Sequence, residues 1–267
     1  MEKCEVNRTV LNVAGVCNLK CKNCLAFIPY YEKKWIMGLA EAKITIKNYF
    51  DVVDSVGTFT ITGGEPLLNQ EIAKILWETN IYRAQIRNNI DFVTNATIVP
   101  AEDVLNFFAQ NRDHARIILS DYGPELSVKM DEIRALLDER NITYRVSKFV
   151  GDDMYFDGWI DFSDHSLKWD TIESRDANAR KCIHGAGKYF VINDGEIHRC
   201  SRSYWRIKNG IIPKVEGEYC PINDSTLSIE EKRNILNGMM KQTSVTSCGY
   251  CVGLVNGVKR VKPAIQL

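Results

Sequence analysis

Three closely spaced cysteines constrain this chain more than any other feature of its sequence. Cys17, Cys21 and Cys24 have a C-x3-C-x2-C spacing and directly follow a strand-like run. Three thiolates can hold three irons of a four-iron, four-sulfur cluster and leave the fourth iron without a protein ligand, whereas electron carriers close all four positions. An open iron can bind and activate a small molecule. The spacing therefore predicts an iron–sulfur enzyme.

Two other uses of cysteine fit this spacing less well. Structural zinc takes four ligands, commonly as two short pairs, and no further cysteine follows Cys24 until Cys182. A disulfide framework is not expected either, because nine cysteines is an odd number and 267 residues can bury a full core without cross-links.

A second motif follows a short β-branched run at residues 58–62. It reads Gly63-Gly64-Glu65-Pro66. Two glycines at a strand end let the backbone approach a ligand closely, Glu65 offers a carboxylate to an ammonium group, and Pro66 ends the strand ladder. Taken alone, the same residues also fit a plain Gly-Gly turn with an exposed glutamate.

Together the two motifs resemble the radical S-adenosylmethionine (SAM) superfamily. The resemblance implies that the open iron chelates the amino and carboxylate groups of the methionine moiety of SAM. It also implies that Gly63, Gly64 and Glu65 cradle that amino group. One position departs from the family, because the residue before the third cysteine, often aromatic there to contact adenine, is Asn23.

Residues 8–150 alternate between strand-like and helical patterns. The expected strands are Thr9–Ala14, Thr58–Thr62, Asp91–Asn95, Arg116–Ser120 and Ile142–Ser147. Apolar stripes between them predict helices, represented by Ile46, Tyr49, Phe50 and Val53; by Ile72, Ile75 and Leu76; by Val104, Phe107 and Phe108; and by Leu126, Met130, Ile133 and Leu137. Repeated strand–helix units predict an α/β fold with a parallel sheet. By resemblance, residues 1–180 form a partial (βα)6 barrel, with the last strand around Trp159–Phe162.

In such barrels the active site lies at the carboxyl ends of the strands. Both motifs fall there, and Asn95 and Ser120 end two further strands. By resemblance, polar residues at these ends contact the ribose and carboxylate of SAM. Asparagine and serine are also common turn and cap residues, so a structural role is equally open.

The C-terminal part of the chain carries four more cysteines in a second pattern. Cys182 and Cys200 flank a predicted hairpin, Lys188–Ile192 and Glu196–Cys200, whose Asn193-Asp194-Gly195 link is a turn sequence. A capping box at Ser228 predicts a following helix, and Cys248 and Cys251 come after it as a C-x2-C pair. Two cysteines from the hairpin and two from the pair provide four ligands.

This pattern resembles the twitch domain, a short form of the SPASM domain that holds an auxiliary four-iron cluster. The resemblance implies a domain at residues 181–267, with a second cluster on Cys182, Cys200, Cys248 and Cys251. A four-cysteine zinc ribbon uses the same ligands and remains an alternative. Cys220 lies between the paired ligands and has three candidate roles: an ordinary buried thiol, an extra ligand, or a hydrogen-atom donor to substrate.

The resemblance also implies a reaction. The reduced N-terminal cluster cleaves SAM to a 5′-deoxyadenosyl radical, which abstracts hydrogen from a substrate carbon, and the auxiliary cluster accepts the remaining electron. Members of similar layout include 2-deoxy-scyllo-inosamine dehydrogenase. The hypothesis is therefore an oxidoreductase that converts a small, carbohydrate-like alcohol to a ketone.

Three alternatives remain open at this stage. The first is an epimerase that uses Cys220 as hydrogen donor. The second is modification of a ribosomal peptide, for which the short N-terminus leaves no room for a leader-binding domain. The third is a non-catalytic iron–sulfur or zinc module.

Composition sets the expected partners and compartment. Thirty-four basic and thirty-four acidic side chains cancel, so neither nucleic acid nor an anionic membrane is an expected partner. The sequence has no apolar run of membrane-spanning length and no signal-peptide pattern at its N-terminus. Many reduced thiols suit the cytoplasm. The expected partners are a small-molecule substrate and an external one-electron reductant such as flavodoxin or ferredoxin.

Overall fold

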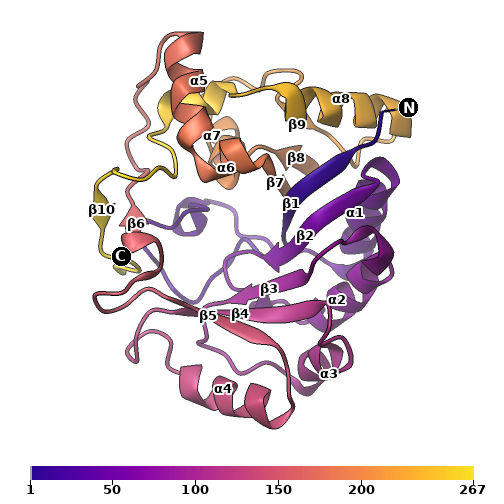
Figure 1. Ribbon diagram of the computed structural model, residues 1–267, viewed down its shortest axis with the longest axis vertical. Coiled ribbons are helices and arrows are strands. Elements are labelled where there is room, and N and C mark those ends of the chain that lie inside the picture. The colour runs from indigo at the N-terminus through magenta and orange to yellow at the C-terminus, as the bar shows by residue number, and fades with distance from the viewer. Residues whose placement is uncertain (1) are drawn as a thin grey trace.

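The computed structural model describes residues 2–267. Its centre is an eight-stranded sheet in the order β5-β4-β3-β2-β1-β7-β8-β9 (Figure 1). All neighbouring pairs from β5 to β7 are parallel, and β8 and β9 add antiparallel strands at one edge. The strands are β1 (Glu5–Asn12), β2 (Ser55–Thr62), β3 (Ile90–Thr94), β4 (Ala115–Asp121), β5 (Tyr144–Lys148), β7 (Tyr189–Asn193), β8 (Glu196–His198) and β9 (Tyr219–Cys220).

Four helices alternate with the first five strands: α1 (Leu39–Val52), α2 (Ile72–Asn80), α3 (Glu102–Gln110) and α4 (Met130–Glu139). The apolar stripes predicted from the sequence lie on these helices, apart from Val53 and Leu126, which flank α1 and α4, and nearly all of their residues are buried in one core that includes Ile46, Tyr49, Phe107 and Leu137. In Figure 1, α1, α2 and α3 lie on one side of strands β1–β5, whereas the C-terminus lies on the opposite side. The predicted α/β class with a largely parallel, barrel-like sheet is confirmed.

The C-terminal third adds α5 (Ile172–Lys181), α6 (Ile183–Gly187), α7 (Ser201–Lys208) and α8 (Ile229–Lys241). The predicted hairpin is β7 and β8, and both Asp194 and Gly195 in its turn have positive φ, as a tight two-residue turn requires. The capping box is also present, because the Ser228 side chain accepts from Glu231 N while the Glu231 side chain accepts from Ser228 N.

The sixth parallel strand is not where the sequence placed it. Trp159–Phe162 does not join the sheet; instead β6 (Trp159–Ile160) pairs antiparallel with β10 (Arg260–Val261). The position beside β1 is taken by β7, which pairs with β1 in parallel. The main sheet therefore continues across the expected domain boundary at residue 180, because the hairpin of the C-terminal part completes the sheet of the N-terminal part.

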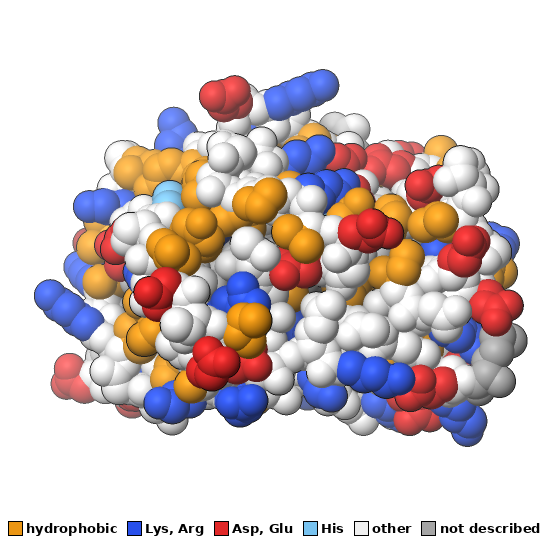
Figure 2. Space-filling view, turned by 90° about the horizontal axis from the view of Figure 1, so that it is seen from above, with side chains coloured by type: hydrophobic (Ala, Val, Ile, Leu, Met, Phe, Trp, Pro, Cys, Tyr) orange, Lys and Arg blue, Asp and Glu red, His pale blue; other side chains and the backbone are white. Residues whose placement is uncertain are grey.

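No helix within residues 2–267 is both long and apolar enough to cross a lipid bilayer. On the face of the molecule that Figure 2 shows, acidic and basic side chains are interspersed, in keeping with the balanced composition.

Candidate active site

The three-cysteine motif forms a compact loop at the carboxyl end of β1. Backbone hydrogen bonds run from Cys24 N to Cys21 O (3.2 Å) and from Phe27 N to Cys24 O (3.0 Å). Leu19 N donates to Cys17 Sγ at 3.4 Å. Burial raises the pKa of Cys17 to about 12, so this thiol needs a metal or another positive charge to become a thiolate.

Close packing against the cysteine loop explains why the second motif contains two glycines. Gly64 N donates to Ala14 O (2.6 Å) and Glu65 N donates to Val16 O (2.9 Å), so the end of β2 lies directly on the start of the cysteine loop. A Cβ atom on Gly63 would lie 2.5 Å from Ala14 O, and one on Gly64 would lie 2.0 Å from Val16 O. Only glycine permits this approach.

This packing predicts that Gly64→Ala destabilises the protein. The added Cβ would meet the backbone carbonyl of Val16 and the Cβ of Cys17, so we expect a loss of about 1–3 kcal/mol in the free energy of unfolding, or more if the loop is displaced. Gly238→Ala is the matched control, because Gly238 lies inside α8 with nothing within 4 Å of its would-be Cβ. That change should stabilise by roughly 0.5–1 kcal/mol. Chemical denaturation of the metal-free protein measures both, and equal stabilities would contradict the packing argument.

Glu65 is buried, and its carboxylate is occupied by the chain itself. One oxygen accepts from Leu67 N (3.0 Å) and Thr94 Oγ1 (2.9 Å), and the other accepts from Asn95 N (2.8 Å). Burial outweighs these bonds and raises the pKa of Glu65 to about 7. The carboxylate therefore joins the ends of β2 and β3, a role that the sequence did not reveal. A contact between Glu65 and SAM stays a prediction.

Asn95, at the end of β3, reaches the cysteine loop. Its Nδ2 lies 3.6 Å from Cys17 Sγ and donates to Asn18 Oδ1 at 3.0 Å. A side-chain amide that donates to a ligand sulfur stabilises the thiolate and tunes the metal group that the sulfur holds. Asn95 thus contacts one of the three thiols directly, and its predicted contact with SAM remains untested.

Ser120 ends β4 and is buried. The nearby Ser127 hydroxyl lies within hydrogen-bond distance of Ser120 O (3.0 Å) and Asn95 O (2.9 Å), which ties the ends of β3 and β4 together. Tyr122, two residues further on, lies close to the cysteine loop: burial chiefly raises its pKa, and the charges of the three thiols add to the rise. Four strand ends therefore meet around one loop, as expected for the carboxyl edge of a parallel sheet.

The far C-terminus also contacts the cysteine loop, which no sequence motif indicated. Gln266 Nε2 donates to Cys21 Sγ at 3.3 Å, and its Oε1 accepts from Lys20 N at 2.7 Å. Two backbone bonds, Lys22 N to Ile265 O and Leu267 N to Lys20 O, hold this tail in place. Gln266 is separated from Cys21 by 245 positions, so only the folded chain could show the contact.

The second set of cysteines converges on one cavity. Cys182, Cys200, Cys248 and Cys251 all line it, although they come from three separate segments. Two backbone amides donate to these sulfurs, Gly253 N to Cys251 Sγ (3.3 Å) and Leu254 N to Cys182 Sγ (3.4 Å). Within residues 2–267, no three Cys, His, Asp or Glu side chains approach closely enough to hold a single metal ion. A four-iron cluster spreads its ligands over the corners of a cube.

The other side chains of this cavity fit an anionic cluster. Arg199, Arg202 and Arg206 line it, and all three are buried. Each has at least one guanidinium nitrogen with no hydrogen-bond partner. Burial by itself would raise the pKa of Cys251, but Arg202 and Arg206 outweigh it and lower the pKa of that thiol. Cationic donors around four thiols suit a group that binds thiolates.

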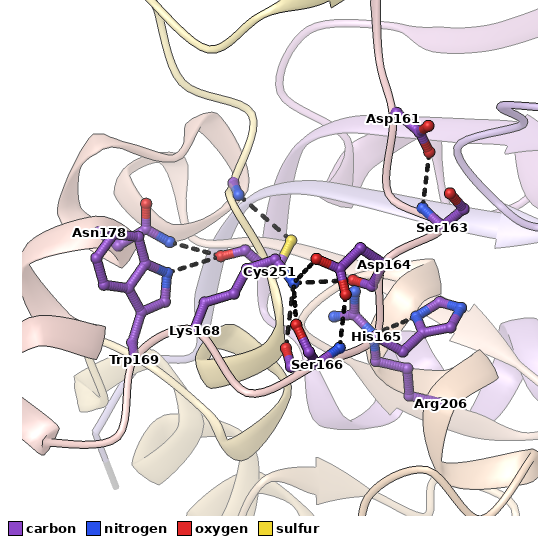
Figure 3. A network of polar contacts seen from close by, with 11 residues as sticks. Asp161, Ser163, Asp164, His165, Ser166, Lys168, Trp169, Asn178, Arg206 and Cys251 are labelled. Atoms are coloured by element: carbon purple, nitrogen blue, oxygen red, sulfur yellow. Dashed lines mark hydrogen bonds and ion pairs between the residues drawn. The ribbon is translucent and has the colours of Figure 1, made fainter.

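Residues before and within α5 hold the last cysteine pair in position, as Figure 3 shows. Trp169 Nε1 and Asn178 Nδ2 both donate to Cys251 O, at 2.9 and 3.0 Å. Arg206 Nε donates to His165 Nδ1 at 3.4 Å. The segment that links the two halves of the chain therefore braces the cavity.

An aromatic contact joins the two groups of cysteines. Phe27, whose amide bonds to Cys24, packs against Trp205 with ring centroids 4.5 Å apart. His165 lies against both rings, at 5.5 and 5.1 Å. Cys251 belongs to the same apolar cluster. The cysteine loop and the cavity are thus neighbours across a small aromatic layer.

Cys220 is not among the cavity-lining cysteines. It is fully buried on β9 within the main core, where its Sγ lies 3.5 Å from Lys232 O. Burial raises its pKa to about 12. This placement in the core favours the ordinary buried thiol. A role of Cys220 as an extra ligand or as a hydrogen donor stays a prediction.

The chain has the fold of radical SAM enzymes. It is similar over its full length, and over the full length of the other chain, to BtrN in complex with AdoMet and 2-DOIA, with a TM-score of 0.60 and 16% identity. Native anSMEcpe with bound AdoMet gives a TM-score of 0.55 and 14% identity, over 88% of this chain and 82% of that one. At such low identity, these similarities concern the fold.

One curated relative matches in sequence. A GTP 3′,8-cyclase of Clostridium acetobutylicum is 34% identical over 95 residues, which cover 34% of this chain and 27% of the relative. The chain thus spans about a quarter of the length of this relative. No protein-family profile matches the chain. The comparisons therefore show the fold of radical SAM enzymes and a sequence match to part of one relative.

Proposed function

We propose that this protein is a radical SAM oxidoreductase that oxidises a small, carbohydrate-like alcohol to a ketone. When bound, SAM and the N-terminal cluster would supply a 5′-deoxyadenosyl radical, and an auxiliary cluster would supply an electron acceptor. Cys17, Cys21 and Cys24 would hold the first cluster. Cys182, Cys200, Cys248 and Cys251 would hold the second.

The cavity that four cysteines line together carries this proposal. Four thiols leave no coordination site free, so a cluster held there moves electrons and does not bind substrate. Loss of a hydrogen atom from the alcohol carbon, then of the hydroxyl proton and one electron, gives the ketone. A closed cluster beside the cysteine loop suits the last of these steps.

Asn95 and Gln266 would support the first cluster. Both donate side-chain amide hydrogen bonds to ligand sulfurs, Cys17 Sγ and Cys21 Sγ, and such bonds stabilise thiolates and shift the potential of the metal group. The C-terminal tail that carries Gln266 also covers one side of the loop, which would limit the access of water and oxygen.

The substrate class rests on the BtrN likeness, since that structure contains 2-DOIA. A second candidate is a peptide substrate, because native anSMEcpe with bound AdoMet and Kp18Cys peptide is also similar, with a TM-score of 0.55 over 98% of this chain and 93% of that one. The two candidates differ in substrate and share the chemistry.

Product analysis after anaerobic reconstitution tests the proposal. The reconstituted protein would be supplied with SAM, a one-electron reductant, and either aminocyclitol and polyol alcohols or serine- and cysteine-containing peptides. We expect 5′-deoxyadenosine and a carbonyl product that a hydrazine reagent captures, with deuterium moving from the alcohol carbon to 5′-deoxyadenosine. Turnover of the peptides alone would favour the second candidate. Uptake of solvent deuterium without a carbonyl would indicate epimerisation, and no SAM cleavage would remove the radical chemistry.

A further inference from the structure

Three arginines surround the four-cysteine cavity. Arg199 directly precedes Cys200, whereas Arg202 and Arg206 lie on α7, one helical turn apart. All three line the cavity, and their exposed fractions are 2%, 2% and 0%. We call these three residues the arginine cradle. Guanidinium groups stay protonated in proteins, so the cradle places three positive charges in the interior.

No carboxylate neutralises these charges. None of the ion pairs found within residues 2–267 includes a residue of the arginine cradle. Arg199 donates to the carbonyl of Gln242 at 3.0 Å, and Arg206 donates to the carbonyl of Ser247 at 3.0 Å. Neutral carbonyls leave the net charge unchanged. Buried cations without an anion are costly, so the cradle requires an anionic occupant in the cavity.

Phe162 and Phe190 lie below the guanidinium groups of Arg202 and Arg199, at 4.3 and 5.1 Å from the ring centroids. The cavity therefore presents about three positive charges, set among aromatic rings that exclude water.

This charge matches the reduced form of a four-iron cluster better than the oxidised form. With four thiolate ligands, such a cluster carries a formal charge of about −2 when oxidised and about −3 when reduced. Fixed positive charges stabilise the more negative of the two states, and they do so more strongly where water is excluded. Charge and hydrogen bonds to the sulfurs are known determinants of cluster potential.

We propose that the arginine cradle raises the reduction potential of the auxiliary cluster and thereby makes it an electron acceptor. This inference rests on the proposed function, because it requires that the four cysteines hold a cluster. It adds a residue-level reason for oxidation over a redox-neutral outcome: Arg199, Arg202 and Arg206 bias the cluster towards taking an electron from the substrate radical.

An electrochemical titration followed by electron paramagnetic resonance tests the inference. The full chain with Cys17, Cys21 and Cys24 replaced by alanine isolates the auxiliary cluster. In that background, Arg202→Gln should lower the reduced-to-oxidised ratio at a fixed potential by at least about tenfold, which is 59 mV for a one-electron couple. Arg202→Lys should return most of the shift, because it restores the charge.

Lys208→Gln is the matched control. Lys208 lies at the end of the same helix, and its side chain is half exposed, so losing its charge should leave the potential nearly unchanged because solvent screens it. If the Arg202→Gln variant does not assemble the cluster, the same titration of the Arg206→Gln variant tests the inference.

The outcomes separate the two proposals. A background protein that assembles no auxiliary iron under anaerobic reconstitution would remove the proposed second cluster and, with it, the basis of the inference. If the cluster assembles and neither Arg202→Gln nor Arg206→Gln changes its reduction potential, only the inference about the arginine cradle is overturned. A shift as large for Lys208→Gln as for Arg202→Gln would also overturn it.

Discussion

Replacing Cys17, Cys21 and Cys24 together with alanine is expected to reduce reductive SAM cleavage to the background of the assay. All three thiols come from one loop that packs against the end of β2, whereas the other six cysteines lie in the main core or line the four-cysteine cavity. An open iron exists only if the chain supplies three ligands and leaves the fourth position free. Release of 5′-deoxyadenosine, measured with iron content, checks the prediction.

The iron content should fall by about half, since the auxiliary cluster would stay bound. Cys4→Ala is the matched control, because Cys4 is a fully buried thiol of the main core, outside both sets of ligands. That control should keep full iron and full SAM cleavage. Persistent SAM cleavage in the triple variant would contradict the assignment of these three thiols.

Replacing Cys248 and Cys251 with alanine is expected to abolish ketone formation while SAM cleavage continues. These two residues supply half of the thiols in the cavity. Without the auxiliary cluster, the substrate radical has no acceptor for its remaining electron, so hydrogen abstraction would no longer lead to the oxidised product. Measuring 5′-deoxyadenosine and carbonyl product in the same sample gives their ratio directly.

The two cysteine variants serve as controls for each other. Each should lose about half of the iron, yet only the first should lose SAM cleavage. A double variant that still forms ketone at the normal ratio to 5′-deoxyadenosine would contradict the role of electron acceptor, even if the cluster itself were present in the unaltered protein.

The repeating part of the fold could be predicted because its signals are local. The β-branched runs, the apolar stripes on α1–α4 and the capping box of α8 each lie within about 15 residues, and the structure contains all of them. The sixth parallel strand could not be predicted in the same way. Trp159–Phe162 has the composition of a strand, but β7 takes the place beside β1.

The candidate site likewise combines features that local sequence patterns indicated with features that only the folded chain shows. Spacing alone indicated the three-cysteine loop at Cys17. The four cysteines that the sequence analysis grouped from distant segments all line one cavity. Cys220 had an equally suggestive position in the sequence, yet it lies in the core. The side chains that contact the sulfurs, Gln266 above all, carry no spacing signal. The only sequence signal of the arginine cradle is the helical spacing of its three arginines around Cys200.

The sequence by itself indicated two candidate sets of thiols, because cluster ligation requires particular residue types. It determined the alternation of strands and helices, because burial follows the periodicity of each element. The tertiary structure alone decided what surrounds those thiols: the Asn95 and Gln266 amides, the Glu65 carboxylate that joins β2 to β3, and three guanidinium groups that each keep at least one nitrogen without a hydrogen-bond partner. These contacts join segments up to 245 positions apart. Such contacts depend on the whole sheet closing beside β1, which no local pattern encodes.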